Sequence, residues 1–261
     1  MQTLQSVGSL TARAKFSPTA QPGQNDSEMM WHVAEEVAVG ILVNGTPITV
    51  MMATPVDLED LAAGFLLAEG YLDNVLNIRR IRILSTETGF CVNVAVGKPL
   101  RRKLSERSME GRSGCGLCGI HALTDVTFKL PHRVRPALHA EAITTAFGAL
   151  NSYQPMNAAN HSVHAAGFAT RDGVIHWARE DVGRHNALDK LIGALKRNHI
   201  DVNSGFAVMT SRCSFELVQK AVISGLGGLA TLSAPTALAL EMAHRAGLPL
   251  ASRAPGGVAL F

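Results

Sequence analysis

The chain has 261 residues, of which 47% are apolar and 17% are charged, so it can bury a large core as one domain or two. Its formal net charge of +3 is too small to indicate that the molecule as a whole wraps nucleic acid or adheres to a membrane. The four cysteines are too sparse for a disulfide framework, and the N-terminal residues contain no apolar segment of signal-peptide length. We therefore expect a reduced, cytoplasmic protein with no nucleic-acid or membrane partner.

The N-terminal part begins with a stretch in which we find no periodicity. Residues 1–28 are rich in Ser, Thr, Gln, Gly and Pro, which is typical of a flexible tail. A smaller α+β subdomain is expected over 29–110. Its first feature is Asn44-Gly45 between two β-rich runs, and this dipeptide predicts a hairpin because both residues tolerate positive φ.

A helix and two strands are expected after this hairpin. Asp57 can cap a helix that carries apolar residues on one face and ends at Gly70. The runs 78–85 and 90–97 are predicted strands, and the valines of the second run share one face. Cys91 lies on the other face of that strand and is interpreted as a packing residue.

The C-terminal part, 122–261, alternates strands and helices, which predicts an α/β domain with a central sheet. The turn 171–173 adds a hairpin, so the sheet is expected to be mixed. The uncharged run 221–240 contains Pro235 and three glycines, and we interpret it as strand and helix rather than a membrane span. The predicted elements are helix 139–153, strand 163–170, helix 185–198, strand 205–210, helix 214–225, strand 229–234, helix 235–247 and strand 248–254.

A glycine-rich segment, 111–121, separates the two parts and contains Cys115 and Cys118. The run 98–112 carries six cationic side chains against two carboxylates, and nearby cations lower the pKa of a thiol. The glycines would let a partner reach the sulfur, so we interpret the segment as a mobile loop with a reactive dithiol. The alternatives are half of a zinc site, with His121 as a third ligand, or an inert pair, and the chain has no second Cys-x-x-Cys.

The tripeptide His139 to Glu141 matches the His-x-Glu of zinc-dependent deaminases. Those enzymes place Pro-Cys-x-x-Cys after that motif, whereas here Cys115 and Cys118 come before it and no proline precedes them. We therefore interpret these residues as the polar opening of a helix.

Polar residues gather where predicted strands meet helices. Arg184 and His185 open a helix after Gly183, and a helix N-terminus suits phosphate because its N–H groups and its dipole favour anions. A solvated, salt-bridged helix start is the alternative interpretation. His161 and His164, at the entry to a predicted strand, could contact a polar ligand or belong to ordinary polar surface.

Two later junctions repeat this arrangement. Arg212 and Ser214 precede a helix that Ser214 could cap, and Cys213 between them is interpreted as a packing residue. Ser233 and Thr236 occupy the third junction. Because open α/β sheets bind ligands beyond the ends of their strands, a phosphate-rich cofactor is the expected ligand.

Taken together, the motifs resemble those of the formate dehydrogenase accessory family, the FdhD sulfur carrier proteins, over roughly 35–257. The early segment "NGTPITVMMATPVDLEDLAAGFLLAEGYL" resembles the N-terminal part of that family. The later motifs that carry the resemblance are "SGCGLCG", "HSVHAAGFA", "REDVGRHNALDKLIG", "SRCSFELVQKA" and "SAPTALALEMA".

The resemblance implies a cytidine-deaminase-like α/β fold, a mixed sheet flanked by helices without the deaminase zinc, and a homodimer. It implies a sulfurtransferase that accepts sulfane sulfur from a cysteine desulfurase as a persulfide on Cys115, with Cys118 assisting or resolving. Sulfur would be delivered to bis-molybdopterin guanine dinucleotide for formate dehydrogenase, and GDP would mimic this cofactor. The alternatives are a zinc-dependent nucleoside deaminase and a protein that escorts the cofactor without moving sulfur.

The C-terminal segment of the family contributes to cofactor binding and corresponds here to 252–257. Arg253 stands where the family has an aromatic residue, and Pro255 stands where an arginine is usual, so Arg253 could restore the positive charge. The residues expected to bind the cofactor are His161, His164, Arg184, His185, Arg212, Ser214, Ser233, Thr236, Arg253, Ala254, Pro255, Gly256, Gly257 and Val258.

Overall fold

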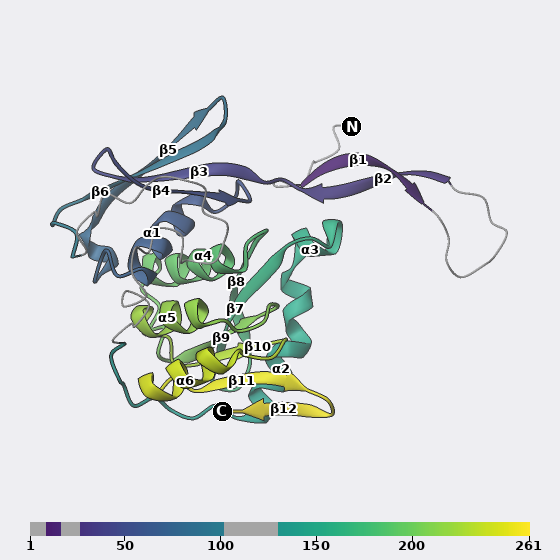
Figure 1. Ribbon diagram of the computed structural model, residues 1–261, viewed down its shortest axis with the longest axis vertical. Helices are drawn as coiled ribbons and strands as arrows, with labels where there is room; N and C mark the ends of the chain where they lie inside the picture. The colour runs from purple at the N-terminus through teal and green to yellow at the C-terminus, as the bar shows by residue number, and fades with distance from the viewer. Residues whose placement is uncertain (1–8, 17–26, 102–129) are drawn as a thin grey trace.

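The computed structural model describes residues 9–16, 27–101 and 130–261 (Figure 1). Its strands form a two-stranded ribbon, a four-stranded sheet and a six-stranded sheet, and helices pack against the two larger sheets. The expected mixed α/β architecture is therefore confirmed. None of the helices in these three ranges has the length and apolar character that crossing a membrane requires.

The four-stranded sheet consists of β3 (Val37–Val43), β4 (Thr46–Ala53), β5 (Ile78–Thr86) and β6 (Gly89–Val96), with the short 3-10 turn η1 (Val75–Asn77) before β5. Its order is β4-β3-β6-β5, in which β3 and β6 are parallel and the outer pairs are antiparallel. Asn44 and Gly45 join β3 to β4 with φ of 49° and 84°, which confirms the hairpin. Val92 and Val94 are fully buried, whereas Cys91 is half-buried on the opposite face.

Helix α1 (Leu58–Ala68) is buried along nearly its whole length between this sheet and the rest of the molecule. It ends just before Gly70, whose φ of 72° requires the left-handed region, as expected. The predicted cap at Asp57 is wrong, because Asp57 has a φ of 54° and its side chain makes no cap bond. Its carboxylate instead lies 3.4 Å from the guanidinium of Arg179, an ion pair that the local sequence could not reveal.

The six-stranded sheet has the order β12-β11-β10-β9-β7-β8. Its strands are β7 (His164–Thr170), β8 (Ile175–Asp181), β9 (Gly205–Met209), β10 (Leu229–Thr231), β11 (Leu250–Ala254) and β12 (Gly257–Leu260). Strands β9, β10 and β11 are parallel, and the pairs β7–β8, β7–β9 and β11–β12 are antiparallel. The predicted strands and the hairpin turn at 171–173 are confirmed, while β12 was not predicted.

Helices cover both faces of this sheet (Figure 1). They are α2 (Ala140–Ala149), which continues as η3 (Leu150–Tyr153), α3 (Pro155–Asn160), α4 (Arg184–Arg197), α5 (Phe215–Ser224) and α6 (Ala237–Ala246). The residues of β9 show why both faces are covered, because apolar side chains alternate between them. Ala207 and Met209 join the core under α4, α5 and α6. Phe206 and Val208 join the second core under α2.

The ribbon of β1 (Ser9–Phe16) and β2 (Ser27–Ala34) corrects the expectation of a flexible tail over residues 1–28. Leu10 and Ala12 alternate with Thr11 and Arg13, a strand pattern that the polar composition of the region concealed. Pairing along the whole length of both strands satisfies the backbone groups that face the partner strand. Figure 1 shows the ribbon extending away from the sheets, beside α3. Helix α3 was also not predicted.

Helices α1 and α4 cross in direct backbone contact. A Cβ added to Gly64 of α1 would lie 1.7 Å from the carbonyl oxygen of Asp189, and one added to Gly193 of α4 would lie 1.9 Å from that of Asp60. Only glycine fits at either position. Residues from both larger sheets join one apolar core at this crossing, so the predicted units 29–110 and 122–261 share their core.

Candidate functional site

Strand register brings the three predicted junctions to one edge of the six-stranded sheet. His164, the first residue of β7, pairs with Asp181, the last residue of β8. Met209 at the end of β9 pairs with Ala166 of β7 and with Thr231 at the end of β10. The strand ends that precede α4, α5 and α6 therefore lie side by side with the entry to β7.

Three helices begin at this edge and direct their N-termini toward it. Gly183 precedes α4, whose first residues are Arg184 and His185. Ser214 precedes α5, and Thr236 caps α6 by accepting a hydrogen bond from the backbone N–H of Ala239. The aligned helix dipoles make this edge a favourable place for anions.

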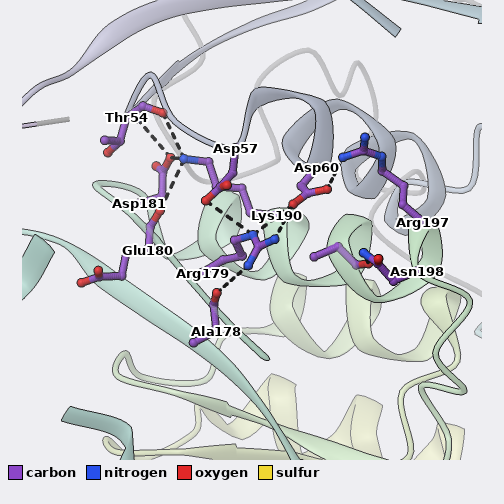
Figure 2. Close-up of polar contacts among 11 residues, drawn as sticks. Thr54, Asp57, Asp60, Ala178, Arg179, Glu180, Asp181, Lys190, Arg197 and Asn198 are labelled. Atoms are coloured by element: carbon purple, nitrogen blue, oxygen red, sulfur yellow. Dashed lines mark hydrogen bonds and ion pairs between the residues drawn. The ribbon is translucent and has the colours of Figure 1, made fainter. Parts of the chain in front are cut away.

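A buried ion pair holds the start of α4 (Figure 2). The ammonium of Lys190 lies 2.7 Å from the carboxylate of Asp181, and both side chains are fully buried. Lys190 also donates to the backbone carbonyl of Thr54. The backbone N–H of Thr54 in turn donates to Asp181. The other Asp181 oxygen accepts hydrogen bonds from the Gly183 N–H and the Asn186 amide. Every donor in this network therefore points inward, toward the fold.

Asp189, further along α4, is also internal. Asp189 accepts two hydrogen bonds of 2.9 Å from Lys220 of α5, and Lys220 lies 2.8 Å from Glu69. Burial alone would lower the pKa of Lys220, but the two carboxylates raise it above its ordinary value, so Lys220 remains a cation. A solvated, salt-bridged helix start does not describe this segment, because Asp181, Asp189 and Lys190 are all buried.

Four buried polar atoms at the starts of α4 and α5 make no hydrogen bond within the described part of the chain. They are Arg184 Nε, His185 Nε2, Ser214 Oγ and Glu216 Oε2. His185 Nε2 and Glu216 Oε2 face each other at 4.0 Å, which is too long for a hydrogen bond. Buried polar groups in native proteins nearly always have partners, so this set is typical of a site that receives a polar ligand.

One prediction about these residues is wrong, and one residue was missed. The expected cap by the Ser214 hydroxyl is wrong, since Ser214 occupies the cap position but its Oγ makes no cap bond. Glu216 was missed by sequence reasoning, because an acidic residue in the first turn of a helix is common and carries no signal of a site. Its position became informative only when the fold placed it opposite His185.

The electrostatics of the edge keep both of its half-buried histidines neutral. Burial, followed by the nearby Arg184 and Lys220, lowers the pKa of His185 to about 3. Burial and Arg184 also lower the pKa of His164, with partial compensation from Asp181. The Nδ1 atom of His164 lies 3.4 Å from the Thr210 hydroxyl. Neutral imidazoles can donate or accept a hydrogen bond without adding charge to the site.

Cys213 is fully buried behind this edge, as the packing interpretation requires. Burial and the carboxylate of Glu216 raise the pKa of its thiol to about 12. The thiolate form needed for sulfur chemistry is therefore not populated at neutral pH. Cys213 is therefore a packing residue of the apolar core.

Other predicted residues lie apart from the helix N-termini. His161 ends α3 with a φ of 55°, and its ring lies 6.2 Å from that of Trp31 in the ribbon. Arg253 places its guanidinium 5.6 Å above the ring of Phe147 in α2, on the sheet face opposite α4, α5 and α6. Ser233 is exposed at the start of the α6 junction.

The segment Ala254 to Val258 forms the β11–β12 hairpin at the same edge of the sheet. Ala254 pairs with Gly257, so Pro255 and Gly256 form a two-residue turn in which Gly256 has a φ of 78°. Proline fits the first position of such a turn and glycine the second. The turn backbone remains exposed beside the strand ends.

The predicted loop 111–121, with Cys115, Cys118 and His121, lies outside the described residues. Within the described ranges, no group of three His, Cys, Asp or Glu side chains could hold a metal ion. His139 precedes the first residue of α2 and Glu141 lies in its first turn, which confirms that this tripeptide opens a helix.

Comparisons with known proteins agree on one family. The model of the FdhD/NarQ family matches residues 34–259. The sulfur carrier protein FdhD of Xanthomonas euvesicatoria pv. vesicatoria is 45% identical over 226 residues, which covers 84% of this chain and 79% of that protein. The protein of the same name from Cupriavidus necator is 44% identical over 223 residues, with coverage of 84% and 77%.

A solved structure is similar over almost the whole fold. The crystal structure of a proposed formate dehydrogenase accessory protein from Desulfotalea psychrophila superposes with a TM-score of 0.73 at 25% sequence identity. The match covers 97% of this chain and 96% of the other. The arrangement of sheets and helices is therefore shared with that protein.

Proposed function

The chain belongs to the FdhD/NarQ family, and from this membership we propose that it is a sulfur carrier that serves formate dehydrogenase. It accepts sulfane sulfur from a cysteine desulfurase and delivers it to the molybdenum cofactor. The observation that carries the proposal is the 44–45% identity to proteins named sulfur carriers. A homodimer, a cytoplasmic location and a cytidine-deaminase-like classification of the fold belong to the same proposal.

Cys115 is the proposed carrier. Its thiolate attacks the outer sulfur of the desulfurase persulfide, so that an S–S bond forms on Cys115 while the desulfurase cysteine leaves as a thiolate. The cationic run before the loop favours the thiolate form. Cys118 assists or resolves. The buried Cys213, with a pKa of about 12, supports this choice because it is a poor alternative.

The substrate that receives the sulfur is proposed to be bis-molybdopterin guanine dinucleotide. Its phosphates would lie at the N-termini of α4 and α5, where Arg184 and Ser214 have polar atoms without partners in the described chain. The exposed Arg212 could add a charge-assisted hydrogen bond. Neutral His164 and His185 are suited to the uncharged polar groups of the ligand.

The test of the carrier role is sulfur loading by a cysteine desulfurase, followed by mass spectrometry of the intact protein. Cys115→Ala should abolish persulfide formation and should fail to activate formate dehydrogenase. Cys91→Ala and Cys213→Ala are matched controls that should load like the wild type. Full loading of Cys115→Ala would refute the assignment. Loading without activation of formate dehydrogenase would refute the delivery step alone, and stoichiometric zinc would favour a deaminase instead.

A further inference from the structure

The four-stranded sheet has one covered face and one open face. Val39 and Ile41 of β3 point toward α1 and are fully buried, as are Val92 and Val94 of β6. Figure 1 shows α1 beneath this sheet, and α1 is the helix that packs on it in the described part of the chain. The opposite side is called the outer face below. Its residues, given by the strand register, are Ala38, Gly40, Leu42, Pro47, Val50, Met52, Arg80, Arg82, Leu84, Thr86, Gly89, Cys91, Asn93 and Ala95.

The outer face is apolar where a solvated face should be polar. Val50 is 51% exposed, Met52 is 48% exposed and Leu84 is 59% exposed. A sheet that packs on the core with one face normally carries polar side chains on the other. Most of the remaining outer-face positions on the two middle strands are also apolar. Folding of the described chain gives no reason for this pattern, whereas contact with another molecule does.

Positive charge borders this apolar surface. Arg80 and Arg82 project from the outer-face positions of β5, and both are exposed. Neither forms an ion pair with any residue of the described ranges, and the outer-face positions include no carboxylate. A partner that covers the apolar positions must therefore meet two guanidinium groups that have no carboxylate partner in the described ranges, and such groups favour carboxylates through bidentate hydrogen bonds.

We propose that the outer face is a docking surface for a second protein, which contributes an amphipathic helix with an apolar face and an acidic flank. Beside Leu42 and Asn93, the middle strands carry the small residues Ala38, Gly40 and Cys91, while the outer strands carry larger side chains such as Met52 and Leu84. An apolar helix face fits between these rows, with its acidic flank along β5. This docking does not depend on the sulfur carrier function.

Charge distinguishes this partner from two others. A second copy of the chain would bring its own Arg80 and Arg82 to the interface without carboxylates, and like charges oppose such a pairing. Nucleic acid would match the arginines but would leave Val50, Met52 and Leu84 without apolar contacts. An amphipathic helix with an acidic flank would cover the apolar positions and also pair with the two arginines.

The test uses two synthetic helical peptides with the same apolar face, one flanked by glutamates and one by lysines. Fluorescence anisotropy with the full-length protein should show the glutamate peptide binding about tenfold or more tightly than the lysine peptide. The double variant Arg80→Glu with Arg82→Glu should reverse that order. Met52→Glu should weaken both peptides. Bound glutamate peptide should also slow alkylation of the half-buried Cys91, measured by peptide mass spectrometry.

The control variants are Val134→Glu and Arg133→Glu, which change an exposed apolar and an exposed cationic residue away from the outer face and should leave both affinities unchanged. Circular dichroism should show all variants folded, since every changed side chain is exposed. Equal affinity for the two peptides, absence of binding, or tighter binding of a short duplex DNA would overturn the proposal. It would also be overturned if sedimentation velocity showed that Met52→Glu dissociates a wild-type dimer.

Discussion

Two regions of α4 treat buried polar groups in opposite ways. Where α4 crosses α1, the buried carboxylate of Asp60 is matched, because Arg179 of β8 pairs with it at 2.8 Å and Arg197 of α4 also contacts it (Figure 2). Arg197 contacts Glu59 as well. At the N-terminal end of the same helix, Arg184 and His185 each keep a buried nitrogen without a partner in the described chain. One helix therefore contains a region completed by the fold and a region left incomplete.

The difference separates structural roles from binding roles. A buried charge that already has its partner stabilises the fold only while both members remain, because loss of one leaves the other unpaired. A buried polar atom without a partner costs free energy in the folded state, and a ligand can recover that cost. Substitutions in the first region should change stability, and those in the second should change ligand affinity.

The largest effect is expected from Lys190→Met, which breaks another completed pair, the buried one with Asp181 that holds the start of α4. Asp181 would then be buried without its cation, which should lower the free energy of unfolding by about 3–5 kcal/mol. Urea denaturation measures the change. The double variant Asp181→Asn with Lys190→Met should recover part of the loss, and Lys98→Met, at an exposed lysine, should have little effect. A silent Lys190→Met would mean that the pair does not hold α4.

Gly193→Ala tests the helix crossing itself. The new Cβ would meet the Asp60 carbonyl at 1.9 Å and should force α1 and α4 apart, at a cost of up to about 3 kcal/mol in stability. Gly148→Ala is a matched control in α2, because its Cβ would have no neighbour within 4 Å. That substitution should stabilise the protein by roughly 0.5–1 kcal/mol. Thermal unfolding of both variants gives the comparison, and two similar shifts would contradict it.

Arg184→Ala tests the incomplete region. Loss of a charge-assisted hydrogen bond to a phosphate should weaken GDP binding by about 1.5–3 kcal/mol, or about ten- to a hundredfold in Kd, with little change in stability. Arg197→Ala, at the other end of the same helix, should lower the stability and leave GDP affinity unchanged. Calorimetric titration with GDP and thermal unfolding measure the two effects. Unchanged GDP affinity in Arg184→Ala would remove this end of α4 from the site.

The smallest effect at moderate pH concerns His185. Its pKa falls from an ordinary value near 6.5 to about 3 in the fold, so the unfolded chain binds the proton more readily. Its contribution to stability is therefore complete above about pH 6.5 and is lost as the pH falls toward 3, with a loss on the order of 1 kcal/mol already at pH 6. His185→Gln should flatten that part of the stability profile, whereas His176→Gln, on an exposed histidine, should not. Parallel profiles for His185→Gln and wild type would show that His185 is not the titrating group.

Local sequence patterns predicted the parts of the fold that local physics controls. Asn44-Gly45 marked its hairpin because the turn conformation depends on those two residues. Most strands and helices after residue 139 followed from their apolar periods, with α3 and β12 as exceptions, and their order placed the three junctions at one edge. The polar composition of the first residues hid the β1–β2 ribbon, whose strands gain regular structure by pairing with each other.

The candidate site was only partly predictable, because its decisive features are contacts between distant segments. Arg184, His185 and Ser214 were expected from their positions at helix starts. Their unpaired atoms, and the opposition of His185 and Glu216 at 4.0 Å, follow from the packing of α4 beside α5. Likewise, Asp57 has the type and position of a cap, but an arginine from β8 competes for its carboxylate.

The glycine contact between α1 and α4 has a mechanical consequence. Two helices that touch through their backbones leave no compliant side chains between them, and a close-packed interior transmits displacement rather than absorbing it. Helix α1 is fastened to the four-stranded sheet at one side, and α4 begins with Arg184 at the other. The crossing is therefore a stiff joint, and a displacement of the sheet would be passed to the start of α4, where the ligand is proposed to bind.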